Sequence, residues 1–185
     1  MLQKIAWVIA AAAIGTIVRQ GIWKATESPR PLVPQHSSSS VLSRFPARVN
    51  AVFDGDTVVA IDATGVEHRI RFSGVDAPEL AHDGRPAQPG GQEALHWLRG
   101  KIQGQVVVVE VVDRDKWGRE VARISVDGED INLALIRNGL AWAYRQYLRD
   151  TYRGPYIVAE EAARSEGRGL WRDTNPTPPW DWRHQ

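Results

Sequence analysis

Hydrophobic and polar positions recur along the chain with periods that predict a β-rich domain beginning near residue 45. Three strands are expected first, at Ala47–Phe53, Thr57–Asp62 and Val66–Val75, because apolar residues alternate there and glycine-containing turns separate the runs. Two more strands are expected at Gln105–Val112 and Arg119–Val126. The nearly continuous valine run of the fourth strand favours burial on both of its faces.

Apolar residues with helical spacing occur between and after these strands. In the first such segment, Ala94, Leu95 and Leu98 form one apolar stripe. Trp171 follows the last segment, and we expect it to pack the end of that helix onto the domain. The expected helices are Gly91–Ile102, Ile131–Asn138 and Pro155–Glu166. This order predicts a mainly β, α+β fold: a five-stranded OB-fold Greek-key barrel with about three helices.

The composition changes before and after this domain. The run Ile5–Val18 is uncharged between Lys4 and Arg19, which is typical of a signal peptide or a membrane anchor, with a buried N-terminal helix as the alternative. Proline and serine dominate the stretch that follows, which is typical of a tether. We therefore divide the chain into a signal peptide or membrane anchor (1–24), a linker (25–44), the folded domain (45–173) and a tail rich in proline and tryptophan (174–185).

Composition and charge exclude several classes of function. The formal net charge is +1, so there is no overall basic character of the kind that marks many DNA-binding domains. The chain has no cysteine, which excludes a disulfide scaffold, a thiolate zinc site and a cysteine nucleophile. The spacing of His68, His82 and His96 fits neither a zinc site nor a catalytic triad.

Acidic and basic side chains gather in the connections of the predicted barrel. The turn after the first strand carries Asp54 and Asp56, which suit a hard cation but also belong to ordinary turn chemistry. Alternation in the third strand turns Arg71 away from the apolar face, and Asp76 and Glu79 follow in the next loop. A surface ion pair is the alternative interpretation of this second group.

A third group, at residues 113–119, ends with Arg119, and taken alone it is an ordinary solvent-facing loop. Together, however, the three groups contain what phosphodiester hydrolysis requires. These are oxygen ligands for a cation, a carboxylate to position or deprotonate water, and arginines where negative charge develops. An OB barrel can bring these connections to one rim, so the combination predicts a phosphodiesterase site.

Five blocks of sequence occur in the order found in staphylococcal nuclease-like proteins, and a closing Gly-Leu-Trp extends the resemblance over about Ala47–Trp171. The blocks are Val-Phe-Asp-Gly-Asp-Thr-Val, Arg-Phe-Ser-Gly-Val-Asp-Ala-Pro-Glu, Gly-Gln-Glu-Ala, Asp-Lys-Trp-Gly-Arg and Leu-Ile-Arg-Asn-Gly-Leu-Ala. The resemblance implies a calcium-dependent endonuclease that hydrolyses DNA and RNA.

The resemblance also implies a metal site. Asp56 and Asp76 match the family's calcium-binding carboxylates, and Asp54 would lie next to these ligands without binding the ion itself. Ala77 matches the position that supplies a main-chain carbonyl to the ion. The family's usual threonine is absent at this position, but a main-chain ligand survives that change.

Three further positions match residues that act on the phosphate. Glu79 matches the glutamate regarded as general base or water-orienting group, and Arg71 and Arg119 match the two arginines that hold and stabilise the phosphate. Three tyrosines downstream are candidates for stacking on bases, with ordinary core or rim aromatics as the alternative: Tyr144, Tyr147 and Tyr152.

These inferences define the expected partners and place of action. We expect single-stranded or unpaired DNA and RNA as substrates of a monomer that is exported, and either anchored in the membrane or secreted. One alternative is a non-catalytic OB-fold module that binds nucleic acid or protein. Another is an enzyme of this type recruited to an envelope process such as polysaccharide export. The complete set of acids and arginines favours an enzyme, because a simple binder does not need it.

Overall fold

The structure is a computed structural model that describes residues 41–82 and 84–185. The expected signal peptide or anchor (1–24), and the linker as far as residue 40, lie outside the described residues. In the part of the chain that is described, helices of the length and apolar character needed to cross a membrane are not found.

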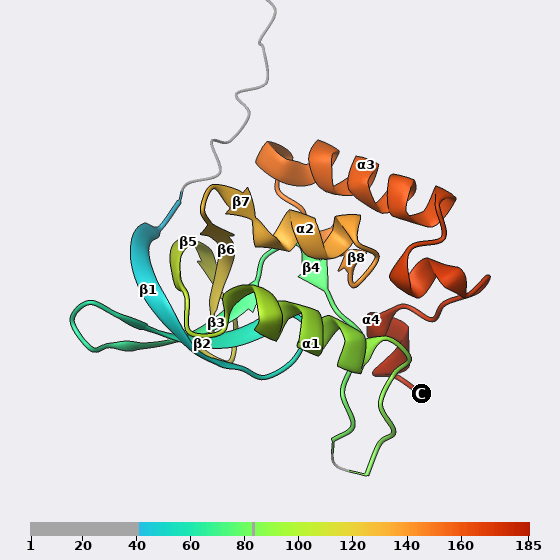
Figure 1. The fold of residues 1–185 in the computed structure, drawn as a ribbon, viewed down its shortest axis with the longest axis horizontal. Coiled ribbons are helices and arrows are strands. Elements are labelled where there is room, and N and C mark those ends of the chain that lie inside the picture. Colours follow the sequence, from blue (N-terminus) through green and yellow to red (C-terminus); the bar gives the residue numbers. More distant parts are fainter. Residues whose placement is uncertain (1–40, 83) are drawn as a thin grey trace, which may run out of the picture. The chain divides into compact units, whose positions relative to one another are not determined.

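The main sheet closes on itself as a barrel (Figure 1). Its strands are β1 (Ser43–Val52), β2 (Thr57–Asp62), β3 (Glu67–Phe72), β5 (Val106–Arg114), β6 (Glu120–Val126) and β7 (Glu129–Asp130). They follow the order β3-β2-β1-β5-β6-β7, and a parallel pairing of β3 with β6 closes the barrel. The five-stranded barrel predicted from the sequence is therefore confirmed, and β7 adds a short strand beside β6.

The third predicted strand, Val66–Val75, is interrupted. Gly74 has a φ of +70°, in the left-handed region that favours glycine, so the chain turns after β3. The next two residues form β4 (Val75–Asp76), which pairs with β8 (Trp142–Ala143) in a second, two-stranded sheet. Asp76 is thus fixed by a pairing outside the barrel, opposite Trp142.

The prediction that the valine-rich fourth strand is buried on both faces was wrong. In β5, Val107, Val109 and Val111 are buried, whereas Val106 is 53% exposed. The strand pairs antiparallel with both β1 and β6, and antiparallel sheets commonly leave one face toward solvent. The two faces therefore differ in burial although most of the side chains are the same.

The helices cover the barrel, with α2 (Ile131–Arg137) lying between it and α3 (Asp150–Ser165) (Figure 1). The helix predicted at Gly91–Ile102 is observed with the same bounds as α1. The last predicted helix begins at Asp150 rather than at Pro155. Proline removes one helical hydrogen bond, but Tyr152 and Tyr156 are both buried one turn apart, and this packing outweighs the loss.

A buried amide connects α2 to the barrel. Asn132 is fully buried, and its amide nitrogen donates to the carbonyl oxygens of Ser73 and Ala122, both at 3.1 Å. Its side-chain oxygen accepts the N–H of Ile124 at 3.0 Å. The helix is therefore fixed to β6 and to the residue after β3, close to the break that leads to β4.

The C-terminal segment lies against the same body. The 3-10 helices η1 (Arg145–Tyr147) and η2 (Gly169–Arg172) precede a short helix, α4 (Pro179–Trp182). Trp171 contacts Trp142 with ring centroids 4.4 Å apart and clusters with Ala163 of α3, which confirms the packing expected for Trp171. The ring of Trp180 also contacts that of Trp142, with centroids 5.4 Å apart. The tail expected at residues 174–185 is therefore packed onto the domain.

Candidate active site

The turn between β1 and β2 supplies the first carboxylate of the site. The Asp56 side chain is only 7% exposed, and its backbone N–H donates to the Asp54 carboxylate at 2.9 Å. A Cβ on Gly55 would lie 2.5 Å from the Cβ of Ala77 and 2.8 Å from that of Ala94. Glycine is therefore needed for this turn to approach residue 77 and α1 so closely.

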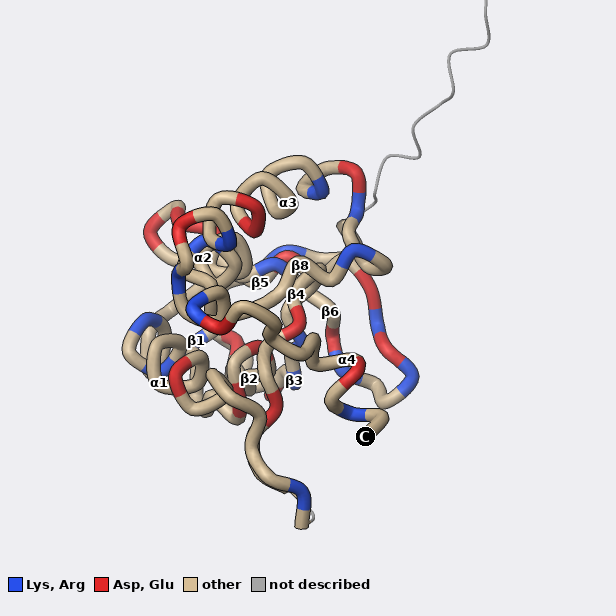
Figure 2. Tube along the Cα trace, turned by 90° about the vertical axis from the view of Figure 1, so that its right-hand side faces the viewer, with Lys and Arg blue, Asp and Glu red and all other residues tan. Residues whose placement is uncertain are grey.

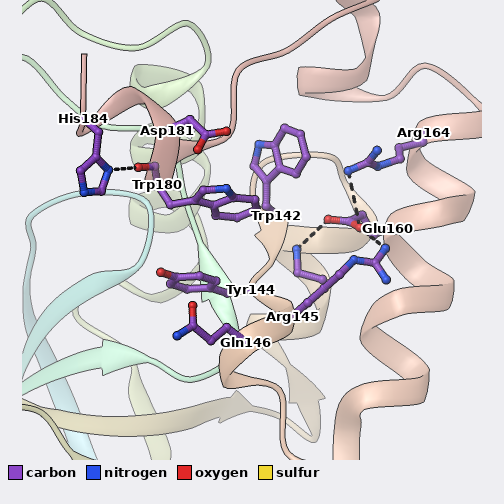
Figure 3. Close-up of a pocket in the computed structure, with 10 residues that line it drawn as sticks. Trp142, Tyr144, Arg145, Gln146, Glu160, Arg164, Trp180, Asp181 and His184 are labelled. Carbon is purple, nitrogen blue, oxygen red and sulfur yellow. Dashed lines mark hydrogen bonds and ion pairs between the residues drawn. The ribbon is translucent and has the colours of Figure 1, made fainter.

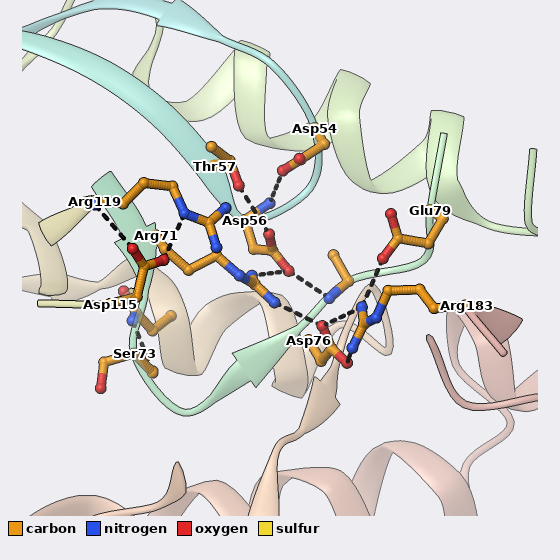
Figure 4. Close-up of polar contacts among 12 residues, drawn as sticks. Asp54, Asp56, Thr57, Arg71, Ser73, Asp76, Glu79, Asp115, Arg119 and Arg183 are labelled. Atoms are coloured by element: carbon orange, nitrogen blue, oxygen red, sulfur yellow. Dashed lines mark hydrogen bonds and ion pairs between the residues drawn. The ribbon is translucent and has the colours of Figure 1, made fainter. Parts of the chain in front are cut away.

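One arginine joins this carboxylate to a second one (Figure 4). Arg71, near the end of β3, contacts Asp56 with one terminal nitrogen and donates to Asp76 Oδ1 at 2.6 Å with the other. The N–H of Ala77 donates to Asp56 Oδ2 at 2.6 Å. The structure thus brings together four residues predicted from separate parts of the sequence: Asp56, Arg71, Asp76 and Ala77.

Glu79 joins this group through a residue that the sequence analysis missed. Arg183, directly after α4, donates to both carboxylate oxygens of Asp76, at 2.9 and 3.1 Å, and to Glu79 Oε1 at 2.6 Å. Asp76 has no exposed side-chain surface, whereas the Glu79 side chain is 24% exposed. The available signal was the sequence Trp-Asp-Trp-Arg in the tail, where two tryptophans precede an arginine.

Arg119 is positioned separately from the acids. Its Nε donates to Asp115 Oδ2 at 2.7 Å, and its backbone N–H donates to Asp115 Oδ1 at 2.9 Å. The exposed ring of Trp117 lies 5.2 Å from its guanidinium. Arg119 precedes β6, which pairs with β3 so that Val121 lies opposite Arg71. Within the described residues, no hydrogen bond or ion pair joins Arg119 to the acid pair.

Arg119 and Asp115 form an ion pair. Burial alone would raise the pKa of Asp115, but hydrogen bonds from the side chain and backbone of Arg119, together with its charge, lower that pKa below its ordinary value. Asp115 therefore stays ionised and fixes the guanidinium through Nε. The terminal nitrogens of Arg119 make no hydrogen bond to the described part of the chain, so they are available to a ligand.

The positive charge around the buried acids does not fully offset the effect of burial on their pKa. Burial raises the pKa of Asp56, and the charge of Arg71 only partly offsets this effect. Burial also raises the pKa of Asp76, against the hydrogen bond from Arg183 and the charge of Arg71. When all groups are ionised, two guanidinium groups face the four carboxylates of Asp54, Asp56, Asp76 and Glu79, an excess of two negative charges.

This excess fits a divalent cation in charge, and carboxylate and carbonyl oxygens are the donors that hard cations such as calcium prefer. Among residues 41–82 and 84–185, however, no three acidic, histidine or cysteine side chains form a ready-made metal site. Only two of the three predicted ligands, Asp56 and Asp76, are side chains, and both are held by arginines. These oxygen donors therefore suit a cation. For the cation to bind, an arginine must first release the carboxylate that it holds.

An aromatic cavity of about 410 Å³ adjoins the tail (Figure 3). Tyr144 lines it together with Trp142 and Trp180, and the ring of Tyr144 stacks on that of Trp180 with centroids 5.2 Å apart. Tyr147 is 56% exposed. Tyr152 is buried and its hydroxyl is 2.6 Å from Ser73 Oγ, so it belongs to the core. Of the three candidate tyrosines, only Tyr144 and Tyr147 are therefore accessible for stacking.

Charge is distributed evenly over the rest of the molecule. Acidic and basic residues are interspersed along the chain in Figure 2, in keeping with the formal net charge of +1. Attraction of a polyanion must therefore depend on individual arginines near the acids, because net charge contributes little.

The chain is similar to known proteins over most of its folded part. The family model described as staphylococcal nuclease homologue matches residues 69–173, a range that includes Arg71 and Arg119 but not Asp56 or Arg183. An uncharacterized endonuclease of Escherichia coli O157:H7 is 36% identical over 140 residues, which cover 75% of this chain and 84% of the relative. An uncharacterized endonuclease of Haemophilus influenzae is 33% identical over 138 residues, covering 75% and 72%. The probable endonuclease LCL3 of Arthroderma otae is 41% identical over 113 residues, covering 56% and 40%.

Proposed function

Because this chain belongs to the family of staphylococcal nuclease homologues, we propose that it hydrolyses phosphodiester bonds in DNA and RNA with the help of a calcium ion. Nuclease activity in general is supported by the family match and by relatives named as endonucleases. Calcium as the metal and the roles of single residues are inferred from the donor chemistry and from the geometry of the acid pair.

The contact of Arg71 with both Asp56 and Asp76 is the observation that carries this proposal. Two carboxylates that share one guanidinium lie close enough to share one cation. The same arginine is then beside any phosphate that such a cation holds, where its planar fork suits two phosphate oxygens. A binding module has no need to bury two carboxylates around an arginine at such cost in desolvation.

We assign Asp56, Asp76 and the main-chain carbonyl of Ala77 as the ligands of the ion. Calcium, when bound, would polarise a non-bridging phosphate oxygen and neutralise part of its charge. The donor set is made entirely of oxygen, which suits calcium. Magnesium demands stricter octahedral geometry and gives up its water less readily, so we expect it to support little turnover.

The remaining residues act on the water and on the phosphate. We assign Glu79, which is partly exposed, to orient or deprotonate the attacking water. Arg71 and Arg119 donate N–H groups to the phosphate as it gains negative charge, and Asp115 holds Arg119 in place for this. Both arginines are fixed by carboxylates before substrate binds, which lowers the entropy cost of using them.

Purified full-length protein incubated with single-stranded and duplex DNA tests this function. We expect cleavage that requires calcium, stops in excess chelator, and is faster on the single strand, since OB-fold proteins commonly bind unpaired strands. Glu79→Gln is the matched variant, and it should bind the same DNA but cut it slowly. Equal rates with magnesium or full activity in chelator would contradict the calcium site, and binding by the wild type without cleavage would identify a non-catalytic module.

We further propose that the enzyme works outside the cytoplasm, tethered through the apolar run Ile5–Val18. The support is compositional: an uncharged run between basic residues is followed by a stretch rich in proline and serine. Full-length protein should fractionate with the membrane and be digested by protease added to intact spheroplasts. Full-length protein in the soluble cytosol would contradict export, and a shortened soluble form outside the membrane would contradict only the anchor.

A further inference from the structure

The acidic cluster of the site already holds a cation that belongs to the chain itself. Arg183 makes three charge-assisted hydrogen bonds there, two to Asp76 and one, at 2.6 Å, to Glu79 (Figure 4). Its two terminal nitrogens cover both oxygens of the Asp76 carboxylate, in the fork arrangement that makes arginine–carboxylate pairs strong. This arginine lies more than a hundred residues further along the chain than the acids that it binds.

The segment that presents Arg183 is held at several other points. Trp180 stacks on Tyr144 with an angle of 12° between the rings. Figure 3 draws both side chains at the edge of the cavity. Gln88 donates its side-chain amide to the carbonyl of Thr177 at 2.7 Å, and Arg85 donates to the carbonyl of Arg183 at 3.1 Å. The guanidinium therefore belongs to a docked segment, and undocking of residues 179–185 would withdraw it from the acids.

The geometry of Arg183 differs from that of Arg119. Both terminal nitrogens of Arg183 donate to carboxylates, as those of Arg71 contact Asp56 and Asp76. Arg119, in contrast, is held through its Nε, which leaves its terminal nitrogens available. Arg183 is thus arranged as a counter-ion for acids, at the oxygens that a metal ion and an activated water would use.

We propose that Arg183 is an internal counter-cation that competes with the divalent cation for Asp76 and Glu79, and that cation binding releases the segment 179–185. The inference rests on the proposed calcium site. In the docked state both oxygens of Asp76 are engaged, and Oδ1 accepts from Arg71 as well. A divalent ion added beside two guanidinium groups would also be repelled by them. Releasing Arg183 frees Oδ2 of Asp76 and leaves one guanidinium, that of Arg71, beside the ion instead of two.

Calcium affinity gives the first test. Full-length wild type and Arg183→Gln are titrated with calcium chloride by calorimetry, with Arg172→Gln as the matched control. Arg172 is another C-terminal arginine, its side chain is 69% exposed, and its contact with Glu93 is a loose 3.7 Å. We expect Arg183→Gln to bind calcium about 5- to 150-fold more tightly, the usual range for coupling between two binding events, and Arg172→Gln to match the wild type.

Hydrogen–deuterium exchange of the wild type gives a test that needs no variant. The backbone N–H groups of Asp181, Trp182 and Arg183 donate to carbonyl oxygens of Pro178 and Pro179, within α4 and its N-cap. A helix this short is not stable in water without packing, so exchange of these groups reports whether α4 stays docked. Saturating calcium should speed exchange in the peptide that contains them, while peptides from α2 stay unchanged. In Arg183→Gln the C-terminal peptide should exchange fast without calcium.

The outcomes separate this inference from the proposed function. Tighter calcium binding by Arg183→Gln with no DNA cleavage by either protein would support the competition and overturn the hydrolysis. Equal or weaker calcium binding by Arg183→Gln, or unchanged exchange in the wild type at saturating calcium, would overturn the competition even if the wild type cuts DNA. No calcium binding by either protein would overturn both. If Arg183→Gln does not fold, hydrogen–deuterium exchange of the wild type with and without calcium still tests the competition.

Discussion

Arg71 donates a hydrogen bond of 2.6 Å to Asp76 although only a left-handed glycine turn separates the two strands that carry them. The acid is fully buried and the arginine nearly so, with 16% of its side chain exposed. This pairing holds a negative charge inside the protein at a position where desolvation disfavours it. Removing the acid should therefore change both the binding of metal and the stability of the metal-free protein.

Asp76→Asn should abolish stabilisation of the fold by calcium. In the wild type, calcium at about 100 times its dissociation constant should add roughly 2.7 kcal/mol to the free energy of unfolding, by mass action. Asparagine removes the anionic ligand, so thermal melts of the variant in calcium and in chelator should coincide. Without metal, the variant should be at least as stable as the wild type, because burial penalises the ionised form of Asp76.

Asp113→Asn is the control for this experiment. Its carboxylate is 64% exposed and pairs with Arg149 at 3.2 Å, away from the acid cluster. The control should keep the full calcium-dependent rise in melting temperature. If Asp76→Asn also keeps that rise, Asp76 is not a ligand of the ion.

Asn132→Ala should destabilise the protein by about 2 kcal/mol or more. The substitution removes the side-chain partner of the Ile124 N–H and of the Ser73 carbonyl, and each such loss costs about 1–3 kcal/mol, whereas the carbonyl of Ala122 still accepts the N–H of Ser73. Urea denaturation measures the change. Asn138→Ala is the control, since it removes one partly buried hydrogen bond to Ala134 and should cost about 1 kcal/mol. A loss below that of the control would mean that the Asn132 network contributes little.

The barrel could be predicted because local signals decide it. Glycine turns and alternating apolar residues define β1, β2 and β3, and α1 has the predicted bounds because its apolar stripe is regular. The errors have tertiary causes. The burial of β5 depends on which neighbours cover it, which a run of valines does not reveal, and the start of α3 depends on packing that outweighs a proline.

The acid–arginine cluster could be anticipated for a different reason. A closed barrel brings its strand ends and turns to one rim, and these carry Asp56, Asp76 and Arg71. Residues that are far apart in the sequence can therefore be expected to lie close together. Arg183 could not be found in this way. It reaches the cluster from a tail outside the barrel, and that tail docks through the contacts of Trp180 with Trp142 and Tyr144. Such contacts have no periodic signature in a short segment.

Substitutions of Arg119 can distinguish stabilisation of the phosphate during hydrolysis from simple charge balance with Asp115. If its terminal N–H groups stabilise charge on the phosphate, lysine cannot replace it, because an ammonium lacks the planar fork. We expect both Arg119→Lys and Arg119→Ala to lose roughly 10²-fold or more in single-turnover cleavage with saturating calcium, as for the loss of one preorganised donor. The loss of its charged hydrogen bond to Asp115 should cost about 1.5–3 kcal/mol of stability.

Arg114→Lys is the matched control for that experiment, because it changes another arginine, at the end of β5, next to the same β5–β6 connection. The Arg114 side chain is 66% exposed and donates to Glu120 at 2.9 Å, so it balances charge without the arrangement found at Arg119. This control should retain near-full activity, and thermal melts should show that every variant is folded. If Arg119→Lys is as active as Arg114→Lys, Arg119 is only a counter-charge for Asp115. Phosphate stabilisation would then fall to Arg71, whose guanidinium is already beside the two carboxylates proposed to hold the ion.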